Sequence, residues 1–129
     1  MRPTKPGEMA AMLRATANQR YEYFIKHVAD SSEAWGLWNG TWAMLQDNSG
    51  TPALPLWPAR EFTETFASTG WTAFEPKLIE LDDFLGELVP SATTQATVFA
   101  IFPVSSDKGV SRAPDLLALD LRHELEKYD

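Results

Sequence analysis

The chain has 129 residues, a formal net charge of -7, 44% hydrophobic residues and no cysteine. This length suits one domain, and the composition is that of a globular protein, not a disordered or fibrous one. The negative charge disfavours nucleic acid and anionic membranes as partners. The lack of cysteine excludes disulfides and thiolate metal sites.

Residues 1–15 are predicted to form an N-terminal arm, with a helix from Glu8, and residues 16–129 to form the single domain. The arm holds Pro3, Pro6 and Gly7 before a short Ala/Met/Leu run. It lacks the apolar core of about 7 to 15 residues that a signal peptide requires, and no later segment is apolar over about 18 residues. We therefore expect a soluble cytoplasmic protein without a membrane partner.

A first helix is predicted over residues 16–29. Thr16 and Gln19 have the spacing of a capping box, in which each side chain bonds the backbone N–H of the other residue. Apolar side chains then recur at helical intervals, at Ala17, Tyr21, Phe24, Ile25 and Val28.

The stretch AWGLWNGTWAML, residues 34–45, predicts a β-hairpin, because Asn39-Gly40 suits the positive φ angles of a type I′ turn. In that register one face, turned to the core, holds Trp35, Leu37, Trp42 and Met44. The opposite face holds Gly36, Trp38, Thr41 and Ala43. The small pair Gly36 and Ala43 leaves a shallow place beside Trp38, so Trp38 is a candidate for contact with another helix or another protein.

Residues 53–57, ALPLW, predict a third strand that lies at an edge or is bulged, because Pro55 cannot donate to a ladder. Pro58 is predicted to open the next helix. Two interpretations of Trp57 stay open. A structural link between strand and helix is favoured, because the following proline holds its backbone extended; the alternative is a binding platform, with Arg60 beside it.

The second half of the chain predicts four further elements. These are an extended segment over 71–79, a short helix from Leu81 ended by Pro90, a central strand over 96–103 and a last helix opened by Pro114. In that last helix Leu116 and Leu119 lie off the stripe formed by Leu117, Leu121, Leu125 and Tyr128, so they are candidates for contact with a partner.

The order of these elements predicts an α+β fold. We expect a single domain whose antiparallel sheet starts with a three-stranded meander and is packed by about four helices.

No catalytic residue, metal ligand or cofactor is predicted. His27 and His123 fall off the apolar faces and lack partners at zinc-binding spacing, so surface positions are favoured for both. Asp82-Asp83 suits the first turn of a helix, where the backbone dipole favours negative charge. The chain has no phosphate-binding or serine-hydrolase motif, which disfavours an enzyme.

An ordered series of motifs resembles a bacterial family, domain of unknown function 2750, over about residues 18–128. The motifs are YEYFIKHVAD, EAWGLWNGTWAML, LPLWP, W-x-x-F-E-P-K, I-x-L-x-x-F-L and FAIFP. The family implies no established activity. Ala113 stands where its members usually have a serine before the proline, which removes a capping oxygen. More loosely, the order of elements is similar to the SseB family and to small toxin-immunity domains.

The preferred hypothesis is a non-enzymatic protein interaction module, regulatory or immunity-like. Its candidate surface residues are Trp38, Trp57, Arg60, Leu116 and Leu119. The alternative is a small-ligand binder or enzyme with a pocket where the third strand meets the next helix, using Arg60, Glu61 or His27. A third option is that the surplus apolar surface makes a homodimer.

Overall fold

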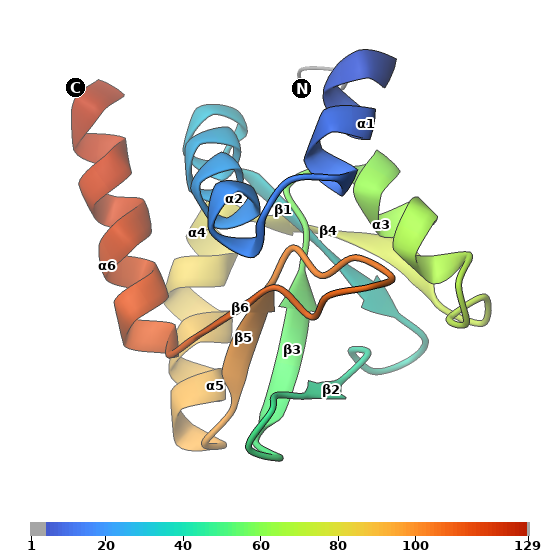
Figure 1. Ribbon diagram of the computed structural model, residues 1–129. Coiled ribbons are helices and arrows are strands. Elements are labelled where there is room, and N and C mark those ends of the chain that lie inside the picture. Colours follow the sequence, from blue (N-terminus) through green and yellow to red (C-terminus); the bar gives the residue numbers. More distant parts are fainter. Residues whose placement is uncertain (1–4, 129) are drawn as a thin grey trace.

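The computed structural model describes residues 5–128, which form one α+β domain with helices around a twisted sheet (Figure 1). The α-helices are α1 (Pro6–Leu13), α2 (Ala17–Ser31), α3 (Arg60–Ala67), α4 (Leu81–Asp83), α5 (Val89–Thr94) and α6 (Pro114–Leu125). A π-helix, η1 (Phe84–Leu88), joins α4 to α5, and a 3-10 turn, η2 (Glu126–Tyr128), follows α6. The strands are β1 (Glu33–Trp38), β2 (Leu45–Gln46), β3 (Pro52–Leu56), β4 (Glu75–Glu80), β5 (Val98–Ile101) and β6 (Val110–Arg112).

The α+β class is confirmed, but the sheet is mixed. β3 runs parallel to β5, whereas β2 with β3, β5 with β6 and β1 with β4 are antiparallel. The long connection between β3 and β5, which contains α3, β4 and the helix from α4 to α5, makes the parallel pairing feasible, because a parallel pair needs a crossover. β1 joins the end of β3 through Trp35 and Trp57, whose backbones exchange hydrogen bonds of 2.9 and 2.8 Å.

The two-residue turn predicted at Asn39-Gly40 and its register are wrong, and the middle strand of the predicted meander is reduced to the Trp38–Trp42 bridge and the short β2. β1 pairs along its whole length with β4. The chain after β1 turns through three residues, so that Trp38 lies opposite Trp42 and the Ala43 N–H donates to the Leu37 carbonyl (2.9 Å). A shift of one residue moves a side chain to the other face of a strand, so Trp42 joins the face of Trp38 instead of the core. Met44, also predicted in the core, is 40% exposed.

Pro55 lies inside the sheet, not at its edge. The Leu56 carbonyl accepts from the Phe102 N–H on the β5 side (2.7 Å), while Trp57 bonds to β1 on the other side. By strand alternation the nitrogen of Pro55 faces the same side as the Trp57 N–H. On that side β2 pairs only with Pro52 and Ala53, and β1 pairs only with Trp57, so neither strand reaches Pro55. The proline therefore interrupts no ladder hydrogen bond.

The capping box of α2 is confirmed. The Gln19 N–H donates to Thr16 Oγ1 (3.1 Å) and the Thr16 N–H donates to Gln19 Oε1 (2.9 Å). Residues 6–13 of the predicted arm are helical, whereas residues 1–4 lie outside the described part of the chain. α3 begins at Arg60, two residues after the predicted start at Pro58.

Pro90 does not end the helix that starts at Leu81. The helix widens to the π form over Phe84–Leu88 and continues as α5, with Pro90 in its first turn. A proline inside a helix removes one N–H and crowds the preceding turn, and a π turn can accommodate both effects. Residues 91–94, directly after Pro90, are therefore helical as well.

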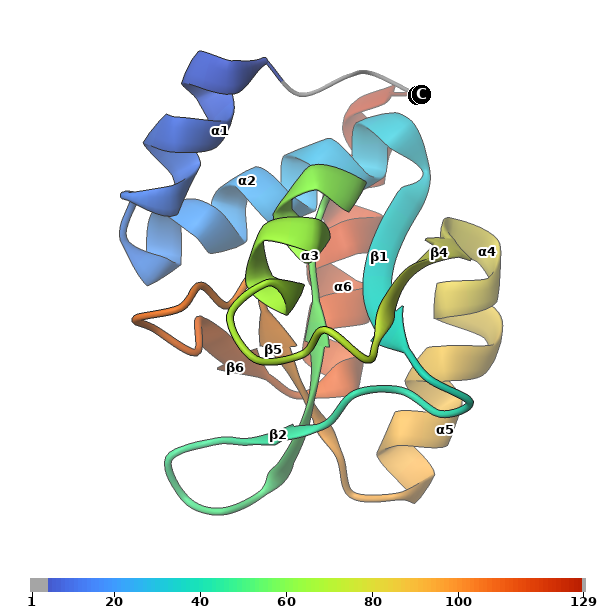
Figure 2. The same cartoon turned by 90° about the vertical axis from the view of Figure 1, so that its right-hand side faces the viewer.

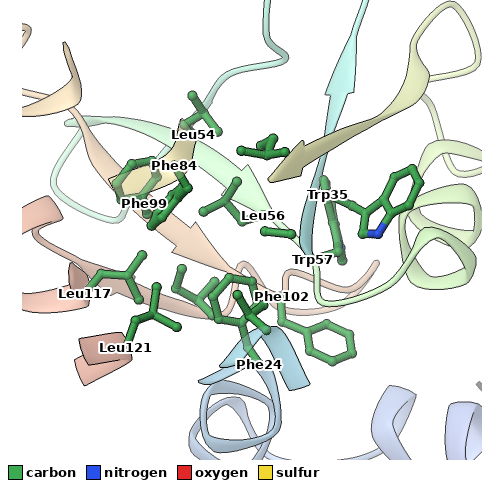
Figure 3. Packing of buried hydrophobic residues seen from close by; sticks show 14 of the residues in the cluster. Phe24, Trp35, Leu54, Leu56, Trp57, Phe84, Phe99, Phe102, Leu117 and Leu121 are labelled. Atoms are coloured by element: carbon green, nitrogen blue, oxygen red, sulfur yellow. The ribbon is translucent and has the colours of Figure 1, made fainter. Parts of the chain in front are cut away.

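The core lies where α2, α6 and the π-helix meet the β3/β5 pair (Figure 3). Strand alternation and register place Leu54, Leu56, Phe99 and Ile101 on one face of this pair. The helices supply Phe24, Phe84, Leu117 and Leu121, each almost fully buried. Burial of one such side chain contributes about 1.5–3 kcal/mol, so these contacts orient the helices on the sheet.

Trp57 is a structural link and not a surface platform. Its side chain is completely buried, its ring lies 5.0 Å from the ring of Phe66 in α3, and its indole N–H donates to the Pro103 carbonyl (2.9 Å). One side chain thus connects β3, α3 and the chain after β5. The structural interpretation is confirmed, and the placement of Trp57 in an interaction surface is wrong because both the ring and its N–H are used inside the fold.

The segment after β5, residues 102–109, is held in a strained conformation by a buried arginine. Phe102 has a φ of 57°, which is rare for a bulky side chain. Arg20 is 2% exposed; its Nε donates to the Phe102 carbonyl (2.9 Å), and its guanidinium pairs with Asp107 (3.3 Å). Such strain persists because the surrounding contacts over-determine the backbone.

Asp107 predicts a pH dependence of stability. Its carboxylate accepts from the Gly109 N–H (2.8 Å) and faces Arg20, and these two interactions hold the pKa of Asp107 below its usual range. A carboxyl group whose pKa is lower in the folded than in the unfolded protein stabilises the fold at pH values above its unfolded pKa of about 3.9. This contribution is lost as the pH falls through the folded pKa. Asp107→Asn should cost at most about 1 kcal/mol at pH 7, because the group is half exposed. Urea unfolding at pH 7 and at acidic pH measures the difference in the free energy of unfolding between the wild type and Asp107→Asn. This difference should be smaller at acidic pH, and an unchanged difference would contradict the prediction.

Within residues 5–128, none of the helices combines the length and the apolar character needed to cross a bilayer.

Candidate functional site: the Trp42 groove

The five side chains predicted to form one interaction surface are not brought together. Trp38 is half-buried beside β4, Trp57 is in the core and Arg60 is exposed at the start of α3. Leu116 and Leu119 are 40% and 60% exposed on the outer side of α6. Figure 1 shows α6 at the opposite side of the molecule from β2 and the segment before it. A combined surface is therefore excluded by position, although Trp38 lies next to a groove.

Trp42 fills the shallow place that the sequence suggested beside Trp38. A Cβ atom added at Gly36 would lie 2.8 Å from Cζ3 of Trp42, closer than real Cβ contacts. Glycine within a strand often marks such a close approach. Gly36 therefore lets the Trp42 indole lie directly against β1, and a partner cannot enter that place while Trp42 occupies it.

Trp38, Trp42 and Lys77 form an aromatic and cationic cluster on this face. The two indoles meet edge to face, with centroids 4.9 Å apart and planes at 76°. The Lys77 Nζ lies 3.9 Å from the Trp38 ring centroid and 5.6 Å from that of Trp42. A cation above a tryptophan face is attracted by the negative face of the ring. Lys77 thereby connects β4 to the pair of indole rings.

Two hollows of about 350 and 510 Å³ meet at Trp42, Leu88 and Ser91. We call them together the Trp42 groove; its lining includes Trp42, Met44, Lys77, Asp83, Glu87 and Leu88. In Figure 2 the segment after β1 turns close to α5, and β4 runs beside α4 and leads into it. One wall is thus a strand and a turn, and the other is the helix that contains the π turn.

The π turn gives the helical wall two different sides. Phe84 at its start is 1% exposed and lies 5.3 Å from Phe99, centroid to centroid, in the core. Glu87 and Leu88 at its end line the groove. π turns occur frequently at functional sites, but here Pro90 also provides a purely structural cause. The turn places one carboxylate and one apolar side chain on the groove wall.

The chemistry of the Trp42 groove suits binding. Trp42, Met44 and Leu88 offer apolar contact, while Asp83 and Glu87 offer carboxylates on one wall. The cation of the groove, Lys77, is engaged with Trp38. Catalysis of acid and base type requires groups held in different environments next to a reacting centre. Asp83 and Glu87 are both exposed on the helical wall.

The alternative pocket between β3 and α3 does not assemble from the residues predicted for it. Arg60 lies over the Trp35 ring (5.7 Å) and pairs with Glu64 (3.7 Å). His27 is only 7% exposed and stacks on Tyr23 (5.4 Å), so its predicted surface position is wrong. It lines a hollow of about 380 Å³ at the end of α2, whereas the hollow of about 120 Å³ on α3 is lined by Phe62, Phe66 and the 102–109 segment. Arg60, Glu61 and His27 do not share either hollow.

A second polar cluster, between α2, β6 and α6, is structural. The Tyr21 hydroxyl donates to Asp120, which also pairs with Arg112 (2.9 Å). Burial, and then the bond to Asp120, raises the pKa of Tyr21, so its hydroxyl stays protonated and serves as a donor. Residues 5–128 contain no group of three or more histidines and carboxylates that could hold a metal ion.

Most groove residues were missed from the sequence. Lys77 lies in β4, Glu87 in the π-helix and Met44 in the connection between β1 and β2, and only the pairing of β1 with β4 brings Lys77 to the indoles. One signal was present: a glycine at position 36, inside an aromatic strand, indicates that a large group approaches the backbone there. The predicted space for a partner beside Gly36 is instead filled by Trp42.

Comparison with known proteins identifies the family of this α+β domain. A family model described as a protein of unknown function (DUF2750) matches residues 21–121, which is most of the chain. The chain belongs to this family, as the motifs in the sequence indicate. No curated protein and no solved structure matches the chain, so the looser likeness to the SseB family is not shown.

Proposed function

We propose that this protein is an interaction module, regulatory or immunity-like, that binds a segment of a protein partner in the Trp42 groove. The observation that carries the proposal is that the two hollows share the walls formed by Trp42, Leu88 and Ser91, together with the exposure of Met44 (40%) beside them. Apolar side chains that are exposed together beside a groove are typical of protein–protein interaction sites.

The shape of the groove favours a macromolecular ligand over a small one. Small-ligand sites usually bury most of the ligand in a concave pocket with a few convergent polar groups. The Trp42 groove is open along its length and mixes tryptophan, methionine and leucine with carboxylates at the wall, as protein interfaces do. The net charge of -7 also opposes nucleic acid as the ligand.

The substitution Met44→Asp tests this proposal. Met44 is exposed, so a carboxylate there should change the free energy of unfolding by no more than about 0.5 kcal/mol. In the groove, however, it places a charge where the partner needs apolar contact. We expect the tagged wild type to capture one stoichiometric protein from its native cell lysate and Met44→Asp to lose it.

Leu119→Asp is the matched control, because Leu119 is exposed on α6, away from the groove. It should capture the same protein as the wild type. The opposite pattern, with capture lost in Leu119→Asp and kept in Met44→Asp, would contradict the groove and move the interface to α6. If light scattering shows a dimer that only Leu119→Asp dissociates, the exposed leucines serve self-association, and the groove proposal loses its support.

A further inference from the structure

The outer edge of β4 is open beside the Trp42 groove. Trp35 exchanges both backbone hydrogen bonds with Trp57, so its N–H and C=O point away from β4. Leu78 lies opposite Trp35, and in an antiparallel pair such a position turns the backbone groups of both residues outward. Leu78 therefore directs its N–H and C=O to the free side of β4. Within residues 5–128, β1 is the single strand neighbour of β4.

The rest of this edge is restricted. Alternation places Pro76 and Glu80 in the same outward orientation as Leu78, but Pro76 has no N–H to donate. Natural sheets protect exposed edges with proline and charged side chains in this way. By the same alternation Leu78 and Glu80 each keep an outward N–H and C=O, and of the two Leu78 also lines the Trp42 groove. Strand pairing beside the groove would therefore centre on Leu78.

The charges around this edge are mainly negative. Asp83 and Glu87 line the groove next to Leu78, and Glu75 and Glu80 stand exposed at the two ends of β4. Lys77 provides the opposing charge, but its ammonium lies on the Trp38 ring. A segment placed along β4 would therefore run between carboxylates, and basic side chains on it would complement them.

We propose that the partner segment is an extended, basic stretch of polypeptide that adds as a strand to the outer edge of β4. This inference rests on the proposed function and specifies its ligand. The Leu78 N–H and C=O pair with the backbone of the segment, while alternate Lys or Arg side chains reach Asp83 and Glu87. Main-chain hydrogen bonds then supply affinity, and the side chains that point into the groove supply specificity.

A second copy of this chain fits the edge less well. Antiparallel pairing of two β4 strands about Leu78 would place the Pro76 of one copy opposite the Glu80 of the other, so the hydrogen bond at that position would lack a donor. It would also bring together two chains that each carry a net charge of -7. A basic strand avoids the charge repulsion and meets the missing Pro76 donor once, whereas a pair of β4 strands meets it twice.

The substitution Leu78→Pro tests the pairing directly. The Leu78 N–H faces outward, so its loss removes no bond to β1, and proline is tolerated on the free side of an edge strand. The circular dichroism spectrum should stay that of the wild type. Ile79→Pro is the contrasting variant, because Ile79 lies opposite Ala34 at a position that bonds to β1, and it should disrupt the fold.

The probe is a synthetic nine-residue peptide of alternating valine and lysine, and its control replaces each lysine by glutamate. We expect the basic peptide to bind the wild type, to bind more weakly in high salt and to protect the Leu78 amide from hydrogen exchange. Leu78→Pro should bind it about tenfold more weakly or not at all, as expected for loss of a main-chain hydrogen bond with added steric hindrance.

Three results would overturn the inference: equal binding of both peptides, no binding of the basic peptide, or unchanged binding by Leu78→Pro. A wild-type dimer that Leu78→Pro dissociates would also overturn it, because a second copy would then occupy the edge. These results leave the proposed function to be judged separately, by partner capture with Met44→Asp. If capture depends on Met44 but not on Leu78, the groove binds its partner without strand addition.

Discussion

Replacement of Trp57 by alanine is expected to lower the free energy of unfolding by about 3–5 kcal/mol. The side chain is completely buried between β3, α3 and the chain after β5, so its loss leaves a cavity that rigid neighbours cannot close. It also removes the donor to the Pro103 carbonyl. For a domain of this size the midpoint of thermal unfolding should fall by about 10 °C or more.

Trp57→Phe separates the two contributions. Phenylalanine keeps much of the buried ring but cannot donate to Pro103, so the expected loss is smaller, about 1–3 kcal/mol. Thermal unfolding of the wild type and both variants, followed by circular dichroism, checks the order of stability. A Trp57→Ala protein as stable as the wild type would refute the central packing role, and equal losses in both variants would assign the whole effect to the hydrogen bond.

Gly109→Ala is expected to destabilise the protein by at least about 3 kcal/mol. Gly109 has a φ of 81°, and a Cβ atom there would press into the Ile101 carbonyl oxygen and lie 3.1 Å from its carbonyl carbon. Two costs therefore combine, the left-handed backbone and a collision with the backbone of β5. Relief of the collision would shift the 102–109 segment, where Asp107 accepts the Gly109 N–H and pairs with Arg20.

Gly50→Ala is the matched control. Gly50 has a similar φ of 86°, but a Cβ there would meet no heavy atom within 4 Å. Its substitution should cost the backbone term alone, roughly 1–2 kcal/mol. Urea unfolding of both variants measures the difference, which isolates the collision at Ile101. Equal losses in the two variants would show that the segment yields to the added methyl group.

The groove itself was not predictable, for a reason visible at Trp42. Its face depends on whether the turn after Trp38 has two or three residues, and the local signal at Asn39-Gly40 favoured two. The pairing of β1 with β4 across about forty residues of chain decided otherwise. Once that pairing is formed, Gly36 accepts the Trp42 indole and Lys77 comes to lie on Trp38.

By itself the sequence determined the features that depend on neighbours along the chain. The capping box at Thr16 and Gln19, the opening of α6 at Pro114 and the α+β class follow from local hydrogen bonding, proline geometry and periodicity. The apolar strand predicted over 96–103 is also present, although β5 itself covers only Val98–Ile101. The tertiary structure alone decided which strands pair, which tryptophans face the core and where an edge stays open. Those outcomes depend on contacts between residues far apart in the sequence, which local propensity does not encode.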